Sequence, residues 1–142
     1  MIWKQAVTAA HMNTVSRGTM VEHLGIVFTD VGADYVEASM PVDERTVQPF
    51  GILHGGASVA LSESLGSMAA YLCIADTSRY TSVGVEINAN HLRSVRSGTQ
   101  VIGRATPVRV GRRIQVWNID IRDGEERLIC TSRLTLAIVE QQ

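Results

Sequence analysis

Thirty consecutive residues, from Thr46 to Ala75, contain a single formally charged side chain, that of Glu63. Within them, Ala57–Ala75 is rich in alanine, leucine, methionine and serine and has no proline, a composition that favours a helix. Its apolar residues fall on more than one side, and a helix that is apolar all round is either buried or spans a membrane. Gly66, four serines and Glu63 weigh against a membrane span, so we expect a helix wrapped by other elements.

The rest of the chain is typical of strands. Thr8–Val15 predicts a short helix, and Ile26–Val31 with Tyr35–Val42 predicts a hairpin that turns at Gly32. Four longer strands are predicted in the second half, at Thr81–Leu92, Gln100–Val110, Arg112–Arg122 and Arg127–Val139. Together these elements predict an α+β fold, a long antiparallel sheet curled around one central helix.

Composition narrows the class of protein. The chain has 142 residues, enough for one domain over residues 1–142, and 45% of them are hydrophobic, which excludes a disordered chain. A net charge of −1 excludes a protein that coats nucleic acid. Cys73 and Cys130 lack CxxC spacing and indicate free thiols rather than disulfides or a zinc site. No apolar leader follows Met1, so the cytoplasm is the expected compartment.

Glu63 is the first candidate functional residue. An ionised carboxylate in apolar surroundings is costly unless it has partners or a raised pKa, and such groups gather at functional sites. The alternative is structural: Glu63 pairs with an arginine of a neighbouring strand, or faces solvent on the polar side of its helix. Ser67 lies one helical turn further along the same face, within reach of the carboxylate or of a water beside it.

The second candidate is the glycine-rich segment Gln48–Ala57, which leads into the helix. The first N–H groups of a helix have no intrahelical acceptor and lie at the positive end of its dipole, a geometry suited to a developing oxyanion. The alternative is an ordinary loop in which His54 caps the helix. Gly55 and Glu63 are eight residues apart, about 12 Å along a helix. Since one reacting carbon cannot contact both, we expect them to act together only across a homodimer, with two composite sites.

Arginine supplies the third feature. Between Ile87 and Ile119 there are six arginines and no acidic residue, at positions 93, 96, 104, 109, 112 and 113. This imbalance favours an anionic partner over solvated strand faces, and arginine suits phosphate. With 5% aromatic residues the chain lacks stacking platforms for RNA, so a compact phosphorylated ligand is expected instead.

These residues resemble a known family. The run from Gln48 through His54, Gly55 and Gly56 to Ser58, followed by Glu63 and then Gly66–Ser67, closely resembles hotdog-fold acyl-CoA thioesterases. Within that family it is most similar to the bacterial aryl-CoA branch, which includes 1,4-dihydroxy-2-naphthoyl-CoA hydrolases and enterobactin proofreading thioesterases. The resemblance covers nearly the whole chain.

The resemblance implies a role for each matching residue. Glu63 would be the nucleophile or the general base that activates water, and Ser67 would position it. The Gly55 amide would polarise the thioester carbonyl, assisted by Gln48 and His54, with loop and glutamate from opposite subunits. Phe50 and Met68 would line the acyl pocket. The CoA moiety would be held by Gly84, by His91, Leu92, Arg93 and Ser94, and by Val108, Arg109, Val110, Gly111, Arg112 and Arg113. Arg109 and Ile114 depart from the pattern, where histidine and a polar residue are more usual.

We therefore expect a thioester hydrolase that cleaves aromatic or medium acyl groups from CoA, 1,4-dihydroxy-2-naphthoyl-CoA among them. Alternatives are a proofreading thioesterase acting on a carrier protein, a hotdog hydratase or dehydratase, and a non-catalytic acyl-CoA-binding protein. No metal or resident cofactor is expected, because the four histidines lack ligand spacing, and GxSxG is absent. The expected assembly is a dimer, and further a dimer of dimers forming a homotetramer, with neither nucleic acid nor membrane as a partner.

Overall fold

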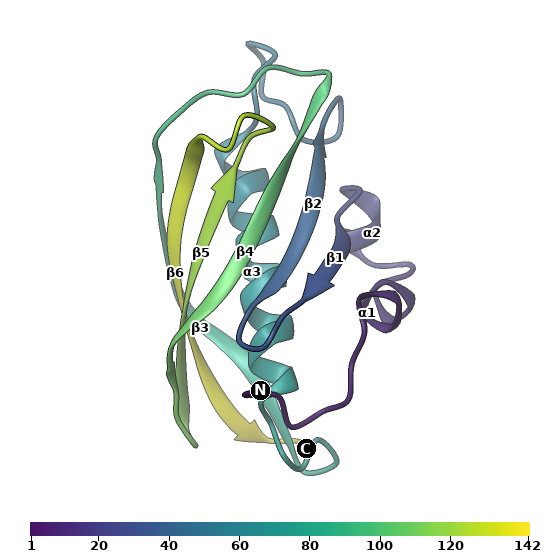
Figure 1. The fold of residues 1–142 in the computed structure, drawn as a ribbon, viewed down its shortest axis with the longest axis vertical. Coiled ribbons are helices and arrows are strands. Elements are labelled where there is room, and N and C mark those ends of the chain that lie inside the picture. The colour runs from purple at the N-terminus through teal and green to yellow at the C-terminus, as the bar shows by residue number, and fades with distance from the viewer.

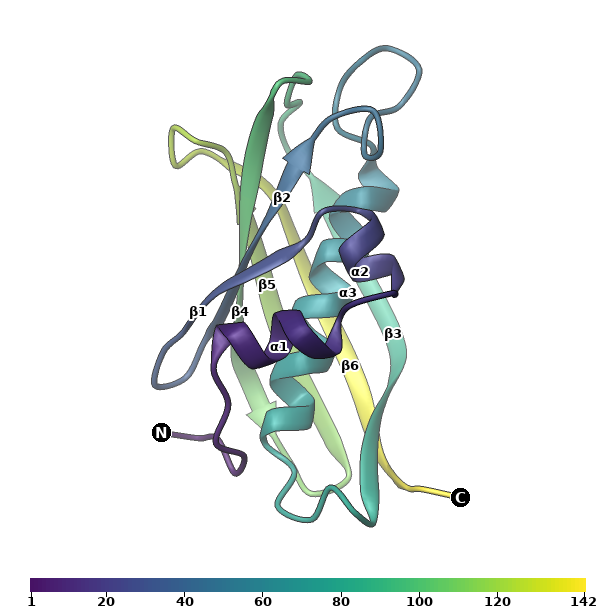
Figure 2. The same ribbon diagram turned by 90° about the vertical axis from the view of Figure 1, so that its right-hand side faces the viewer.

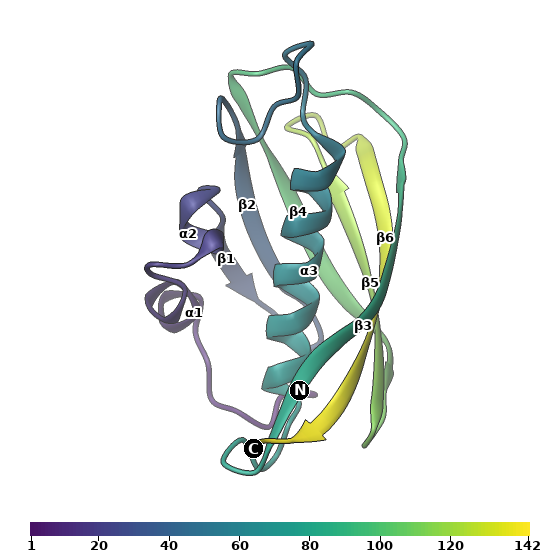
Figure 3. The same ribbon diagram turned by 180° about the vertical axis from the view of Figure 1, so that it is seen from behind.

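A six-stranded antiparallel sheet curls around one long helix, as predicted (Figures 1 and 3). The computed structural model describes residues 1–142. The strand order is β1-β2-β4-β5-β6-β3, with β1 and β3 at the two edges. The strands are β1 (Val27–Val31), β2 (Val36–Val42), β3 (Tyr80–His91), β4 (Thr99–Val110), β5 (Ile114–Arg122) and β6 (Leu128–Glu140), and the helices are α1 (Ala9–Val15), α2 (Met20–His23) and α3 (Gly55–Leu72).

The predicted strands are confirmed to within two residues at each end. The first hairpin closes where Gly32 donates its amide hydrogen to the Tyr35 carbonyl, and the β4–β5 hairpin where Gly111 donates to Ile114. Arg112 and Arg113 were expected in a strand but form the turn between β4 and β5. The pairing register shifts between Gly84 and Glu86 and between Pro107 and Arg109, and such bulges leave no pattern that alternation alone reveals.

The central helix starts two residues earlier and ends three residues earlier than predicted. His54 has extended backbone and its Nδ1 accepts the Gly56 amide hydrogen at 2.7 Å, which caps α3 and draws Gly55 and Gly56 into it. At the other end Cys73 donates to Ala70, and Ile74 donates to Tyr71. These hydrogen bonds span three residues instead of four, so the α-helix ends at Leu72 although the apolar segment continues to Ala75.

One face of α3 is buried and the opposite face is not. Leu61, Leu65, Gly66 and Ala69 pack on the inner face of the sheet, where Gly66 allows a close approach to Leu134. The other face is half-buried in the single chain. Because that face is also apolar, the helix has surface left over for a further partner.

The N-terminal segment lies beside β1 (Figure 2). Thr8 caps α1, as the predicted helix required, and the Asn13 side chain both accepts from and donates to the Phe28 backbone. The second helix, α2, was not predicted, since four residues between two glycine turns carry no periodic signal. Both cysteines are free. None of the helices is long and apolar enough to cross a membrane.

Candidate active site

Glu63 lies on the half-buried face of α3 and has no protein partner. Its side chain makes no hydrogen bond and no ion pair, so the alternative of a structural pair with an arginine does not hold within the chain. Its carboxylate rests against β3 at Gly84, where an added Cβ would lie 3.5 Å from Cδ and closer still to Oε1. Burial raises the pKa of the Glu63 carboxyl above its ordinary value. An unpartnered, partly desolvated carboxylate is equipped to accept a proton.

Ser67 follows Glu63 on the same face but does not bond to it. Its backbone carbonyl accepts a hydrogen bond from the Ser82 hydroxyl at 3.5 Å, and no hydrogen bond joins Ser67 to the glutamate. Met68 is partly buried and packs against the core. Because no hydrogen bond joins them, Ser67 can affect Glu63 only through packing or through a ligand that contacts both residues.

The Gly55 amide is free at the start of α3. It has no acceptor within the helix or in the loop that precedes it. His54 is the helix cap, so its structural interpretation is confirmed. The Gln48 side-chain carbonyl accepts the Phe50 amide hydrogen and shapes the loop, which leaves the Phe50 side chain 90% exposed. The loop presents a free donor at a positive helix end, the geometry expected of an oxyanion site.

A shallow groove of about 410 Å³ runs between α3 and β3. It is lined by Gly56, Val59, Ala60, Glu63, Gly84, Val85, Glu86 and Ile87. Val59 and Ala60 were not predicted as site residues, although they precede Glu63 by one helical turn on the same face. His91, at the end of β3, packs over Gly55, so β3 runs from the glutamate to the helix start.

The outer edge of β3 is unpaired. This edge is 12 residues long and includes Val83 and Val85, which are 43% and 62% exposed. Natural proteins rarely leave a long apolar strand edge open, because its free N–H and C=O groups can pair with another strand.

Most of the predicted anion-binding arginines are unpaired. Among the six between Ile87 and Ile119, only Arg104 forms an ion pair, with Glu37 at 2.7 Å. The unpaired ones fall at opposite ends of the molecule. Arg93 and Arg96 follow β3 near the start of α3, while Arg109, Arg112 and Arg113 lie at the β4–β5 turn near its end.

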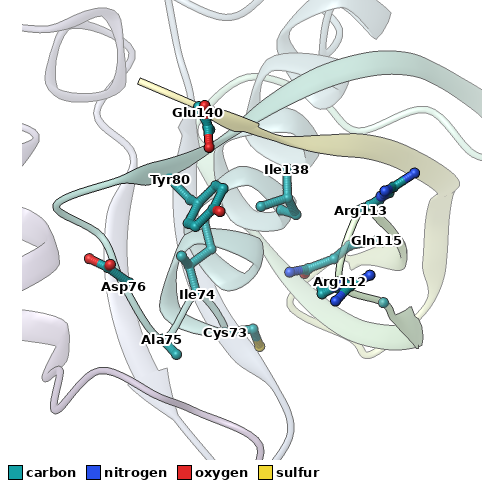
Figure 4. A pocket seen from close by; sticks show the side chains of 11 residues that line it. Cys73, Ile74, Ala75, Asp76, Tyr80, Arg112, Arg113, Gln115, Ile138 and Glu140 are labelled. Carbon is teal, nitrogen blue, oxygen red and sulfur yellow. The ribbon is translucent and has the colours of Figure 1, made fainter. Parts of the chain in front are cut away.

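A hollow lies at the end of α3 (Figure 4). Its volume is about 670 Å³, and Arg112 and Arg113 reach it from the β4–β5 turn. Tyr80 and Ile74 supply an apolar wall, and Cys73, whose pKa burial raises to about 11, adds an unreactive thiol. Cations beside an aromatic wall suit a phosphorylated ring compound.

The single chain therefore divides the predicted site into three groups. Glu63 lies against Gly84, the Gly55 loop lies with His91 at the helix start, and Arg112 and Arg113 lie at its far end. Within the segment 108–113, Arg109 pairs with Val116 on the outer face of the sheet, so that segment is split between two faces. No group of three or more potential metal ligands lies together.

A curled antiparallel sheet around one helix, with a lone carboxylate on the helix and a free amide at its start, defines a hotdog-fold thioester hydrolase. Comparison with known proteins agrees: residues 50–130 match the model of the Thioesterase superfamily, and the chain belongs to that family. It is 55% identical to the proofreading thioesterase EntH of Cronobacter sakazakii over 98% of this chain and 99% of that protein. It is 53% identical to 1,4-dihydroxy-2-naphthoyl-CoA hydrolase of Escherichia coli over 98% and 100%.

Solved structures show the same fold. A thioesterase from Haemophilus influenzae is 54% identical, with a TM-score of 0.94 over 99% of this chain and 96% of that one. Two structures of one Staphylococcus aureus protein, both 37% identical, have TM-scores of 0.82 and 0.80 and cover 86% and 84% of this chain and 99% and 98% of theirs. They carry alanine in place of a glutamate and a glutamine that are 15 residues apart. Gln48 and Glu63 have the same spacing.

Proposed function

We propose that this thioester hydrolase cleaves aromatic acyl-CoA, with 1,4-dihydroxy-2-naphthoyl-CoA as a candidate substrate, and that Glu63 is its general base or its nucleophile. The observation that carries the proposal is the Glu63 carboxylate, half-buried without a partner and with a raised pKa. The name of the Escherichia coli relative supports the substrate class, and the altered glutamate and glutamine of the Staphylococcus aureus protein support the roles of Glu63 and Gln48.

The chemistry follows from these groups. As a general base, Glu63 takes a proton from water while the water oxygen bonds to the thioester carbon, and the Gly55 N–H stabilises the negative charge on the carbonyl oxygen. The C–S bond then breaks, the thiolate leaves and takes up the proton, and the products are a carboxylic acid and CoA. As a nucleophile, the Glu63 carboxylate would instead bond to the thioester carbon and expel the CoA thiolate, and water would hydrolyse the resulting anhydride, which releases the carboxylic acid, restores Glu63 and supplies the proton for the thiolate.

The two groups come from different subunits in this proposal. The edge of β3 is free to pair antiparallel with the same edge of a second copy, which gives a two-fold axis. If the axis passes through Asn88, the bulge at Val85 allows Gly84 to face His91 of the second copy on the inner side of the sheet. Paired residues on neighbouring strands lie about 5 Å apart. Glu63 lies against Gly84 of its own chain, and Gly55 of the second copy lies against His91 of that copy, so this pairing brings the second copy's Gly55 next to Glu63.

A cross-link tests this register. Asn88→Cys puts two thiols opposite each other at the axis, within the Cα spacing that a disulfide accepts, so mild oxidation should give a covalent dimer. Glu86→Cys is the matched control, because Glu86 faces Asn90 in this register and does not meet its own copy. Cross-linking through position 86 instead of 88 would contradict the register, and a monomer by light scattering would contradict the dimer.

The same register gathers the arginines. The start of β3, at Tyr80, runs past the second copy's Ser94, so the hollow that holds Arg112 and Arg113 comes beside Arg93 of the other subunit. We assign this combined surface to the phosphates and adenosine of CoA, because several unpaired guanidinium groups converge there.

The outer face of the sheet supports a dimer of dimers. Val83, Ala137 and Ile114 form one apolar row across three strands, and the next row ends in Glu86 on β3 and Arg109 on β4. Two such faces packed against each other would bury the apolar row between two dimers. Ile114→Glu should then yield dimers by light scattering. A tetramer that survives Ile114→Glu would contradict this interface.

Hydrolysis of a carrier-protein thioester is the second candidate, favoured by the identity to the proofreading thioesterase. The two differ in the leaving group, since only CoA carries the nucleotide. The test compares kcat/KM for benzoyl-CoA, benzoyl-pantetheine and a benzoyl-loaded carrier protein, which share the same acyl group. A higher kcat/KM for benzoyl-CoA supports the first candidate, and a preference for the loaded carrier protein supports the second.

The direct test of the proposal is Glu63→Gln, with Glu63→Ala beside it. A general base contributes about 10²–10⁴-fold, so thiol release from benzoyl-CoA should fall by at least a hundredfold in both variants. A loss of less than about tenfold would refute attack by Glu63. A panel of aromatic and aliphatic acyl-CoA substrates with the unaltered enzyme then identifies the preferred acyl group.

A further inference from the structure

We propose that Gly84 is a positioning residue for Glu63, because the side chain it lacks leaves the space in which the carboxylate lies against β3. This inference rests on the proposed function of Glu63. A Cβ at position 84 would meet Oε1 well inside van der Waals contact, with Cδ at 3.5 Å and Oε2 at 4.0 Å. All of the nearest atoms that such a carbon would meet belong to Glu63.

Glycine is not required here by the backbone. The glycines with positive φ are Gly18, Gly25, Gly51 and Gly98, and Gly84 is not among them. Its conformation is therefore open to any residue, and the requirement for glycine at this position is one of space.

The β-bulge explains why Gly84 faces the helix. Gly84 pairs with Leu136 and Ile87 pairs with Leu134, both of which point inward, while Val85 between them is left without a partner. The bulge thus sets two inward positions three residues apart instead of two. This spacing opens a longer gap on the strand, directly opposite Glu63.

Nothing else holds the carboxylate in place. The Glu63 side chain has no hydrogen bond and no ion pair, so packing alone fixes its position. A methyl group at position 84 would push the carboxylate out toward solvent. The shift would move the base from the reacting water and also relieve the burial that raises its pKa.

A double-mutant cycle on activity tests the inference. A displacement of about 1 Å can cost a hundredfold in rate, so Gly84→Ala should lower kcat for benzoyl-CoA by about tenfold or more with KM changed by less than about threefold. Aspartate is one methylene shorter and does not reach the strand, so adding Gly84→Ala to Glu63→Asp should cost less than about threefold. Gly124→Ala is the matched control, because a Cβ there meets nothing within 4 Å, and it should leave kcat unchanged.

Two readouts separate positioning from other roles. The acidic limb of the pH–rate profile should move to lower pH in Gly84→Ala, because an exposed carboxylate has a lower pKa. If Gly84 instead contacts the substrate, Gly84→Ala raises KM by the same factor in the unaltered enzyme and in the Glu63→Asp variant. Additive effects of Gly84→Ala and Glu63→Asp, on KM or on kcat, would overturn the inference.

Stability gives a measurement that needs no activity. Glu63→Gln should raise the free energy of unfolding at neutral pH in the unaltered protein, and this gain should be smaller in the Gly84→Ala background, where the carboxylate is displaced into solvent and is no longer desolvated. An equal gain in both backgrounds would refute the inference. Full activity in Glu63→Gln would instead refute the proposed function, and the stability cycle would still report on Gly84.

Discussion

Replacing Gly55 with proline removes one hydrogen atom from the proposed oxyanion site with little other change. Proline has no N–H and is favoured in the first turn of a helix, which is where Gly55 lies. The residue before a proline must be extended, and His54 already has φ −70° and ψ 130°. The Gly55 amide makes no hydrogen bond, so the fold loses none.

The expected loss is that of one oxyanion donor, about 10²–10³ in kcat or about 2.7–4 kcal/mol of transition-state stabilisation. Gly55→Ala is the matched control. It keeps the amide and adds the same Cβ, 3.0 Å from Nε2 of His91, so the effect of that contact is common to both variants. Thiol release from saturating benzoyl-CoA should therefore fall at least tenfold further in the proline variant than in the alanine variant. Equal rates in the two variants would refute a role for the amide.

Four further predictions concern the site and the fold. Because burial raises the pKa of Glu63 and only its ionised form accepts a proton, kcat/KM should fall in acid around a pKa above the ordinary carboxyl value, and Glu63→Gln should abolish that limb. The folded state also binds that proton more tightly than the unfolded chain does. Urea titrations should therefore give Glu63→Gln a higher free energy of unfolding than the unaltered protein at neutral pH, and this difference should shrink as the pH falls to the ordinary pKa of a carboxyl group. A difference that grows in acid would contradict the prediction. The double variant Arg112→Ala and Arg113→Ala should raise KM for benzoyl-CoA by about tenfold and leave KM for benzoyl-pantetheine unchanged. If KM for benzoyl-CoA is the same in the double variant and the unaltered enzyme, these arginines do not bind the nucleotide of CoA. Gly66→Ala should lower the free energy of unfolding by about 1–3 kcal/mol in urea, since its Cβ would lie 2.5 Å from Cδ2 of Leu134, and a neutral effect would show that the helix can move away from the sheet.

The fold was predictable because each of its large elements has a local signal. Alternation in β5 and β6 follows from burial on one face of the sheet, and the composition of α3 favours a helix wherever it packs. The ends of α3 were misplaced because they depend on a side-chain cap at His54 and on tightened contacts at Cys73, which composition does not encode. The helix α2 is too short to carry a period.

The residues of the candidate site could be proposed from the sequence, but not their arrangement. One charge in a long apolar segment is a strong signal, and it singled out Glu63 as a candidate before any coordinates. That Gly84 lies against this carboxylate depends on a bulge in β3, and alternation patterns do not reveal bulges. The split of the segment 108–113 between two faces has the same cause, the register shift before Arg109.

Subunit complementation tests the central claim, that each site joins Glu63 of one chain to the Gly55 amide of another. Glu63→Gln and Gly55→Pro chains are each expected to be nearly inactive alone. Co-expressed in equal amounts, they assort at random, half of the dimers are hybrids, and each hybrid keeps one of its two sites intact. The account predicts about a quarter of the activity of the unaltered enzyme per subunit. A mixture no more active than its parents, with hybrids confirmed by native mass spectrometry, would contradict it.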